Sequence, residues 1–137
     1  MGRILVDTNV LVDVLQRDLV WFEWSVDQLS VCSTTDELCI NPIIYAELAQ
    51  RYESRLKLDR VLAKLKLGWV ELDRDTLYLA SQAFALYRSR AGAKSNVLAD
   101  FFIGAQALQH HCKLLTRDPR RYNTYFPSVE LICPAVN

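Results

Sequence analysis

The chain has 137 residues, of which 51% are apolar, and its 16 basic residues balance 16 acidic ones, so that the formal net charge is zero. This length and apolar content are sufficient for one buried core, and we expect a single domain over residues 1–137. No stretch approaches the roughly 18 apolar residues that a membrane span requires, and Asp7 interrupts the apolar N-terminal run. We therefore expect neither a membrane helix nor a signal peptide, and a cytoplasmic location.

The cysteines are scattered along the chain without a close pair. Reduced and mostly buried thiols are expected, because a chain of this size needs no disulfides. A zinc site that includes His110 and His111 is the weaker alternative, since adjacent histidines at a helix end usually complement the helix dipole. The four cysteines are Cys32, Cys39, Cys112 and Cys133.

Charge is unevenly divided along the chain. Residues 1–76 hold 9 Lys/Arg and 13 Asp/Glu, whereas residues 77–137 hold 7 Lys/Arg and 3 Asp/Glu. Zero net charge argues against bulk attraction to nucleic acid, but a local basic rim is suited to a phosphate backbone. The alternative for each residue is an ordinary solvated position. The candidates for such a rim are Arg88, Arg90, Lys94, Lys113, Arg117, Arg120 and Arg121.

The first half of the chain alternates short apolar runs with helical patterns. Residues 4–6 predict a buried strand, and the polar residues after it begin a helix that continues to residue 15. A second helix is expected over 19–31 and a second strand over 38–40. Pro42 then favours the first turn of another helix. A helix over 56–67 is expected to end at Gly68, before a strand over 69–72.

The second half continues this alternation. Asp73 begins a long helix through Tyr87, and residues 88–96 predict a loop in which Ser95 and Asn96 cap the next helix, over 97–111. Strands are expected over 113–116 and 129–132. Strands separated by helices predict βαβ units and a mostly parallel sheet.

Four carboxylates lie beside apolar segments: Asp7, Glu47, Asp100 and Asp118. An ionised carboxylate that leaves water without a partner is costly, so a compensating cation is expected. Two of the acids follow expected strands and two lie near the starts of helices, and ligands of open α/β sheets gather at the carboxyl ends of strands. The pattern predicts a Mg²⁺ or Mn²⁺ site of the kind that cleaves phosphodiesters.

Asp100 shares a predicted helix face with Gly104 and Ala107, small residues that permit close packing, so this face is expected to point inward. Thr8, Asn9 and Thr116 add polar groups that can orient carboxylates. The alternative is structural: Asp7 caps a helix, the Asp118-Pro119 pair begins a turn, and Glu47 lies on a helix surface.

Four segments of the chain resemble, in order, the signatures of PIN-domain ribonucleases, and more narrowly of the VapC-like toxins of bacterial toxin–antitoxin pairs. The segments are ILVDTNVLVD (4–13), IYAEL (44–48), LADFFIGAQA (98–107) and LLTRDPRRY (114–122). The resemblance implies a three-layer α/β/α fold with a short, mostly parallel central sheet. It also implies metal-dependent endoribonuclease activity.

Under this resemblance, the family's catalytic and metal-binding acids correspond to Asp7, Glu47, Asp100 and Asp118, and accompanying polar positions correspond to Thr8, Asn9 and Thr116. The family pattern usually has another residue where this chain has Pro119, which affects the loop that carries Asp118. A DNA nuclease or a phosphatase on the same acidic site is the nearest alternative. A binding domain whose acids only cap helices is a more distant one.

Residues 19–24 carry a surplus of apolar side chains. Trp21, Phe22 and Trp24 fall on more than one side of the expected helix, so one core face does not hide all three. The alternative is a helix buried on two sides. Because VapC-like toxins dimerise and are blocked by an antitoxin, the resemblance implies a homodimer with a cognate antitoxin as partner and RNA as substrate.

Overall fold

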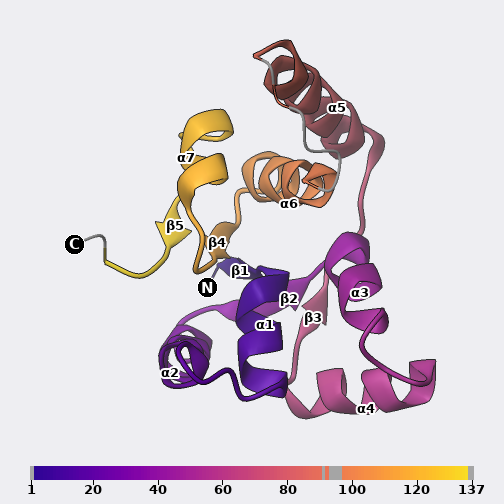
Figure 1. Ribbon diagram of the computed structural model, residues 1–137, viewed down its shortest axis with the longest axis vertical. Helices are drawn as coiled ribbons and strands as arrows, with labels where there is room; N and C mark the ends of the chain where they lie inside the picture. Colours follow the sequence, from indigo (N-terminus) through magenta and orange to yellow (C-terminus); the bar gives the residue numbers. More distant parts are fainter. Residues whose placement is uncertain (1, 91, 93–96, 136–137) are drawn as a thin grey trace.

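The computed structural model describes residues 2–90, 92 and 97–135. Over these residues the strands form one five-stranded sheet of order β3-β2-β1-β4-β5, in which every neighbouring pair is parallel (Figure 1). The prediction of a mostly parallel sheet is therefore confirmed. The strands are β1 (Arg3–Val6), β2 (Glu37–Ile40), β3 (Gly68–Trp69), β4 (Lys113–Leu115) and β5 (Leu131–Ile132).

Helices cover both faces of this sheet. Figure 1 shows α1, α2 and α4 below it and α5, α6 and α7 above it, which gives the expected three-layer α/β/α arrangement. The helices are α1 (Thr8–Leu15), α2 (Phe22–Ser33), α3 (Pro42–Ala49), α4 (Arg55–Lys64), α5 (Arg74–Ser89), α6 (Leu98–Gln109) and α7 (Arg120–Tyr125). None of those within the described ranges has the length and hydropathy needed to cross a membrane.

β1 is the central strand and lies in the core. Ile4, Leu5 and Val6 are all buried, because helices lie on both faces of the sheet and leave no solvated side for polar residues. The strand pairs with β2 on one side and β4 on the other. Asp7 follows directly, and its backbone N–H donates to the Leu115 carbonyl at 2.9 Å, so the first predicted acid lies at the carboxyl edge of the sheet.

Two helix starts that the sequence predicts are present, and each has a side-chain cap. The Asn41 side chain accepts from the backbone N–H of Ile44 at 2.9 Å, with Pro42 in the first turn of α3. Asp73 accepts from the N–H of Thr76 and begins α5. The Ser95-Asn96 cap lies outside the described residues. All four cysteines are free, and Cys133 is the partly exposed one.

Two boundaries in the first half of the chain differ from prediction. The helix expected from residue 19 begins at Phe22, because the Asp18 carboxylate accepts from the N–H groups of Val20 and Trp21 and holds these residues in a turn. The helix expected to end at Gly68 ends instead at Lys64, and Lys66 takes the left-handed conformation (φ 55°). The next strand is correspondingly shorter, Gly68–Trp69 rather than 69–72.

The second half contains one helix that the sequence analysis missed. α7 has no apolar repeat in its sequence, but its Tyr122 is buried in the core. Phe126, just after the helix, is buried in the same core. Pro119 precedes the helix at its N-cap position. The remaining differences are small: α5 continues to Ser89, α6 covers 98–109 instead of 97–111, and β4 and β5 are shorter than predicted.

Candidate active site

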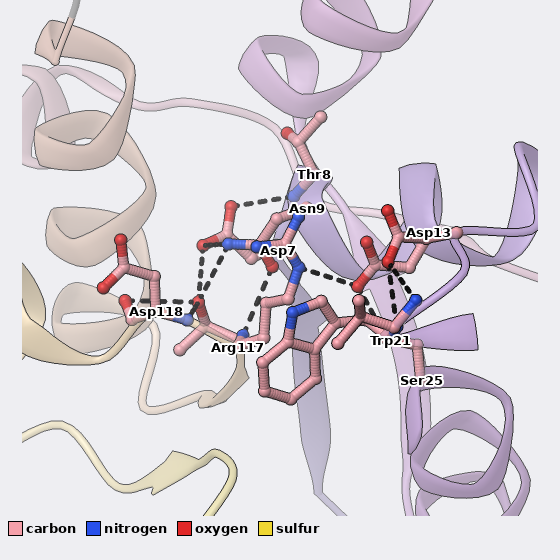
Figure 2. Close-up of polar contacts among 11 residues, drawn as sticks. Asp7, Thr8, Asn9, Asp13, Trp21, Ser25, Arg117 and Asp118 are labelled. Atoms are coloured by element: carbon pink, nitrogen blue, oxygen red, sulfur yellow. Dashed lines mark hydrogen bonds and ion pairs between the residues drawn. The ribbon is translucent and has the colours of Figure 1, made fainter. Parts of the chain in front are cut away.

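Asp7 is the buried centre of a polar cluster at the carboxyl edge of the sheet (Figure 2). Its side chain is only 4% exposed. Oδ1 accepts from the backbone N–H of Thr8 at 2.7 Å. Oδ2 accepts from the hydroxyls of Thr116 at 2.8 Å and Tyr122 at 2.9 Å, and the Asn9 amide lies 3.4 Å away. The three expected polar helpers therefore surround this acid, although Thr8 reaches it through its backbone.

The electrostatic environment of Asp7 is unfavourable to its ionised form. Burial raises its pKa from 3.8 to about 7, against the opposing hydrogen bond from Thr116. The charges of Asp100 and Glu47 raise the pKa further, while the Tyr122 hydroxyl lowers it. Because these acids repel one another, a cation placed among them would restore the ionised state.

Glu47 and Asp100 reach the same region from two helices. The Thr8 hydroxyl donates to Glu47 Oε1 at 2.6 Å, so that α1 orients an acid on α3. Asp100, in the first turn of α6, accepts from Arg121 Nη1 at 2.7 Å. Burial is the main cause that raises the pKa of both carboxyls. The charge of Asp100 raises the pKa of Glu47 further, whereas Arg121 lowers the pKa of Asp100.

A pocket of about 390 Å³ opens between these elements. Three of the four predicted acids line it, together with two of the predicted polar residues and two arginines. The lining residues are Asp7, Thr8, Asn9, Val12, Glu47, Gln50, Arg51, Asp100 and Arg117.

Asp118 does not line this pocket, contrary to the expectation that all four acids converge. Its side chain is exposed, lies 3.4 Å from Arg120 Nε, and borders a separate depression of about 400 Å³ with Arg121 and Tyr125. Figure 2 shows its carboxylate directed away from Asp7. The chain turns here into α7 immediately after Pro119, and this turn carries the side chain outward. Its charge nevertheless lies close enough to raise the pKa of Asp100.

The pocket fits a hard divalent cation by its chemistry. Its candidate ligands are all oxygen atoms, and their mutual repulsion is the kind that a cation relieves. Among the residues that the structure describes, no three His, Cys, Asp or Glu side chains already form a ligand cluster. Asp100 is paired with Arg121, and Glu47 with Thr8, so these side chains would have to exchange partners to meet one ion. The zinc alternative gains no support, because His110 lies beside Asp73 instead.

The predicted basic rim is only partly assembled. Arg117 lines the pocket, Arg120 and Arg121 border the neighbouring depression, and Arg90 lies over the Tyr125 ring. Arg88 is exposed near the end of α5, and Lys94 lies outside the described residues. The prediction of a rim position is wrong for Lys113, which begins β4 and forms ion pairs with Asp36 and Glu130 instead.

Sequence reasoning missed three contacts of the site. Tyr122 donates to Asp7, Arg121 binds Asp100, and the buried Asp13 binds Arg117. Tyr122 lies at the end of one family-like segment, but no residue pattern there marks its hydroxyl as a partner of Asp7. Its role depends on α7, which was not predicted.

A three-layer α/β/α molecule with an acidic pocket at the carboxyl edge of a parallel sheet defines the structural class. The chain belongs to the PIN domain family, whose family model matches residues 4–127. No curated protein matches the sequence significantly.

Three solved structures show the same fold. VapBC2 from Rickettsia felis, bound to a DNA fragment from its promoter, has a TM-score of 0.74 at 14% identity, covering 97% of this chain and 99% of that chain. A toxin–antitoxin complex from Klebsiella pneumoniae has a TM-score of 0.64 at 21% identity, covering 94% of this chain and 95% of that chain. The PIN domain endonuclease Utp24 has a TM-score of 0.55 at 20% identity, covering 98% of this chain and 86% of that chain. At these identities the likeness concerns the fold.

Proposed function

We propose that this protein is a metal-dependent endoribonuclease that acts as the toxin of a toxin–antitoxin pair. The observation that carries the proposal is the pocket in which Asp7, Glu47 and Asp100 meet at the carboxyl edge of the sheet. Family membership and the similarity to Utp24 and to the Klebsiella pneumoniae complex support it. Acidic oxygen pockets of this kind hold Mg²⁺ or Mn²⁺ in phosphodiester cleavage.

Asp7, Glu47 and Asp100 would hold the ion, and Asp118 would join from the rim after its side chain turns inward. When bound, the cation supplies Lewis-acid stabilisation of the charge that develops on the phosphate oxygens. The protein's own part is to keep the carboxylates oriented. The hydroxyls of Thr116 and Tyr122 favour the ionised form of Asp7.

The test is cleavage of a single-stranded RNA and the sequence-matched DNA by the purified chain, with Mg²⁺, Mn²⁺ or a chelator. Cleavage of RNA alone, dependent on the metal, is expected. Asp100→Asn should lower this activity by roughly 100-fold or more, since even outer-shell partners of metal ligands cost 10–100-fold. Asp27→Asn, an exposed acid on α2, removes the same charge and should leave the activity unchanged.

Two outcomes contradict the proposal. Equal cleavage of DNA and RNA would assign the pocket to a general nuclease, and cleavage of neither, with hydrolysis of small phosphate esters, would assign it to a phosphatase. Wild-type activity in Asp100→Asn would remove that acid from the site.

A homodimer and a cognate antitoxin are part of the same proposal. A recess of about 220 Å³, lined by both apolar and polar side chains, adjoins the acidic pocket and shares Val12 and Arg51 with it; Leu15, Gln16, Leu48 and Tyr52 also line it. An apolar segment seated there would lie next to the acids. We assign this recess to the antitoxin, which would block the pocket from its rim.

A further inference from the structure

Asp13 is a buried acid outside the four predicted ligands. Its side chain is 1% exposed, and Oδ2 accepts from Ser25 Oγ at 2.9 Å and from Arg117 Nε at 2.8 Å. Oδ1 is also buried and has no hydrogen-bond partner in the described part of the chain. A buried ion pair adds little stability over an apolar pair of similar volume, and an unsatisfied oxygen lowers its value further. Stability alone therefore does not account for Asp13.

The pair does hold the side chain of Arg117 in one place. Besides the Nε contact, the guanidinium lies 5.8 Å from the centre of the Trp21 ring, and the backbone N–H of Arg117 donates to Asn9 Oδ1 at 3.3 Å. Figure 2 shows the guanidinium reaching Asp13 with the Trp21 ring alongside. Arg117 is 31% exposed and lines the acidic pocket. One edge and one face of the guanidinium are thus fixed by contacts from α1 and from the start of α2.

The part of Arg117 that is not fixed suits a phosphate. Across the described residues, no protein group accepts a hydrogen bond from either of its Nη atoms. Arg121, in contrast, commits Nη1 to Asp100, and Arg120 is 90% exposed beside Asp118. A guanidinium with two free amino groups matches phosphate oxygens in a bidentate geometry.

We propose that Arg117 binds the phosphate of the bond to be cut, and that Asp13 is its positioning residue. This inference rests on the proposed function and assigns the phosphate contact within it. Three acids in the pocket repel a phosphodiester, so a cation is needed on the substrate side as well as among the acids. Because Asp13 and Trp21 already fix the guanidinium, it meets the developing charge without reorganisation, which is the condition for strong electrostatic stabilisation.

The first test is a double-mutant cycle on RNA cleavage. Arg117→Gln should lower kcat on the order of 100-fold, the cost of removing one such donor. Asp13→Asn should lower it less, roughly 10-fold, and the double variant should be no worse than Arg117→Gln, because Asp13 acts through Arg117. Arg74→Gln is the charge-matched control, because Arg74 is exposed at the start of α5. Its neighbour Asp73 contacts His110, which follows the C-terminal end of α6, whereas Asp100 lies in the first turn of that helix.

The second test is independent of cleavage. Binding of a single-stranded RNA oligonucleotide is measured in chelator at several salt concentrations. Arg117→Gln should reduce the slope of log affinity against log salt by about 0.7, the value for one phosphate contact on a single strand. Arg117→Lys keeps the charge and the slope but loses the Nε contact, so its kcat should fall as in Asp13→Asn. If Asp13→Asn does not fold, Arg117→Lys still tests the positioning.

The outcomes separate this inference from the proposed function. Wild-type protein that binds RNA without cleaving it contradicts the proposed function, while the salt slope still tests Arg117. Wild-type cleavage with an unchanged kcat and salt slope in Arg117→Gln overturns the inference alone. If the two losses of kcat multiply in the double variant, Asp13 has only a structural role. A wild-type protein without affinity for RNA overturns both claims.

Discussion

At the scale of single residues, Asp7 couples the site to the stability of the fold. Its pKa rises from 3.8 to about 7 on burial, so between these values the folded chain keeps a proton that the unfolded chain has lost. The stability that this proton provides is complete below about pH 4 and is lost as pH rises through 7. At about 1.4 kcal/mol per pKa unit, the loss is at most about 4 kcal/mol.

Asp7→Asn removes this titration. In chelator, the free energy of unfolding of the variant minus that of the wild type should increase by up to about 4 kcal/mol between pH 4 and pH 8. Urea unfolding at several pH values measures this difference, in which the titrations of groups that do not interact with Asp7 cancel. Mn²⁺ should stabilise the wild type at pH 8 and leave the variant unchanged. A difference that does not vary with pH would show that Asp7 is ionised in the folded chain without a cation.

At the scale of elements, the close contact between α6 and the end of α7 sets the spacing of the site. A Cβ atom at Gly104 would overlap the ring of Phe126, which is buried and has no room to withdraw. α6 carries Asp100 and α7 carries its partner Arg121, so the two helices must approach closely for this pair to form.

Gly104→Ala should therefore destabilise the protein by about 1–3 kcal/mol, the usual cost of overpacking. The sign is diagnostic, because the same change in an open helix stabilises by about 1 kcal/mol. Urea unfolding gives the value, and adding Phe126→Leu should recover part of the loss. A Gly104→Ala protein as stable as the wild type would mean that α7 can move away from α6.

At the scale of the whole molecule, the surface that is free for a partner differs from the aromatic cluster that the sequence indicates. Trp24 packs against the core, and Trp21 contacts Arg117, so neither is an uncommitted anchor. Leu19 and Val20 are instead two adjacent exposed apolar side chains, at 102% and 77% exposure, in the turn between α1 and α2. Exposed apolar groups that adjoin one another are typical of association surfaces.

Replacing both Leu19 and Val20 by Asp should weaken binding of the cognate antitoxin at least 10-fold and leave RNA cleavage unchanged, since neither residue lines the acidic pocket. Leu77→Asp, on the exposed side of α5, is the control for adding charge to an apolar surface position. Titration calorimetry measures the affinity for the antitoxin. Light scattering of the wild-type protein should give a dimer, twice the 15.8 kDa mass of one chain. A monomer would exclude the dimer, and an unchanged affinity would exclude this turn from the antitoxin surface.

The sequence by itself determined the features that depend on neighbouring residues. The run Ile4-Leu5-Val6 followed by Asp7 specifies a buried strand with a carboxylate at its end, because apolar continuity and cap chemistry are local rules. The helix starts at Pro42 and Asp73 follow for the same reason. The alternation of strands and helices was sufficient for the parallel sheet, whereas the three-layer arrangement was expected from the family resemblance. The single-domain prediction and the catalytic roles of the acids remain predictions.

Tertiary structure decided which of these residues meet. Thr8 reaches Glu47 across 39 positions and Arg117 reaches Asp13 across 104, and no local pattern encodes such pairs. The outward turn of Asp118 depends on α7, a helix of six residues that is too short to be stable alone and is held by the burial of Tyr122. Packing of distant segments, rather than local preference, therefore determines which acids and which arginines line the pocket.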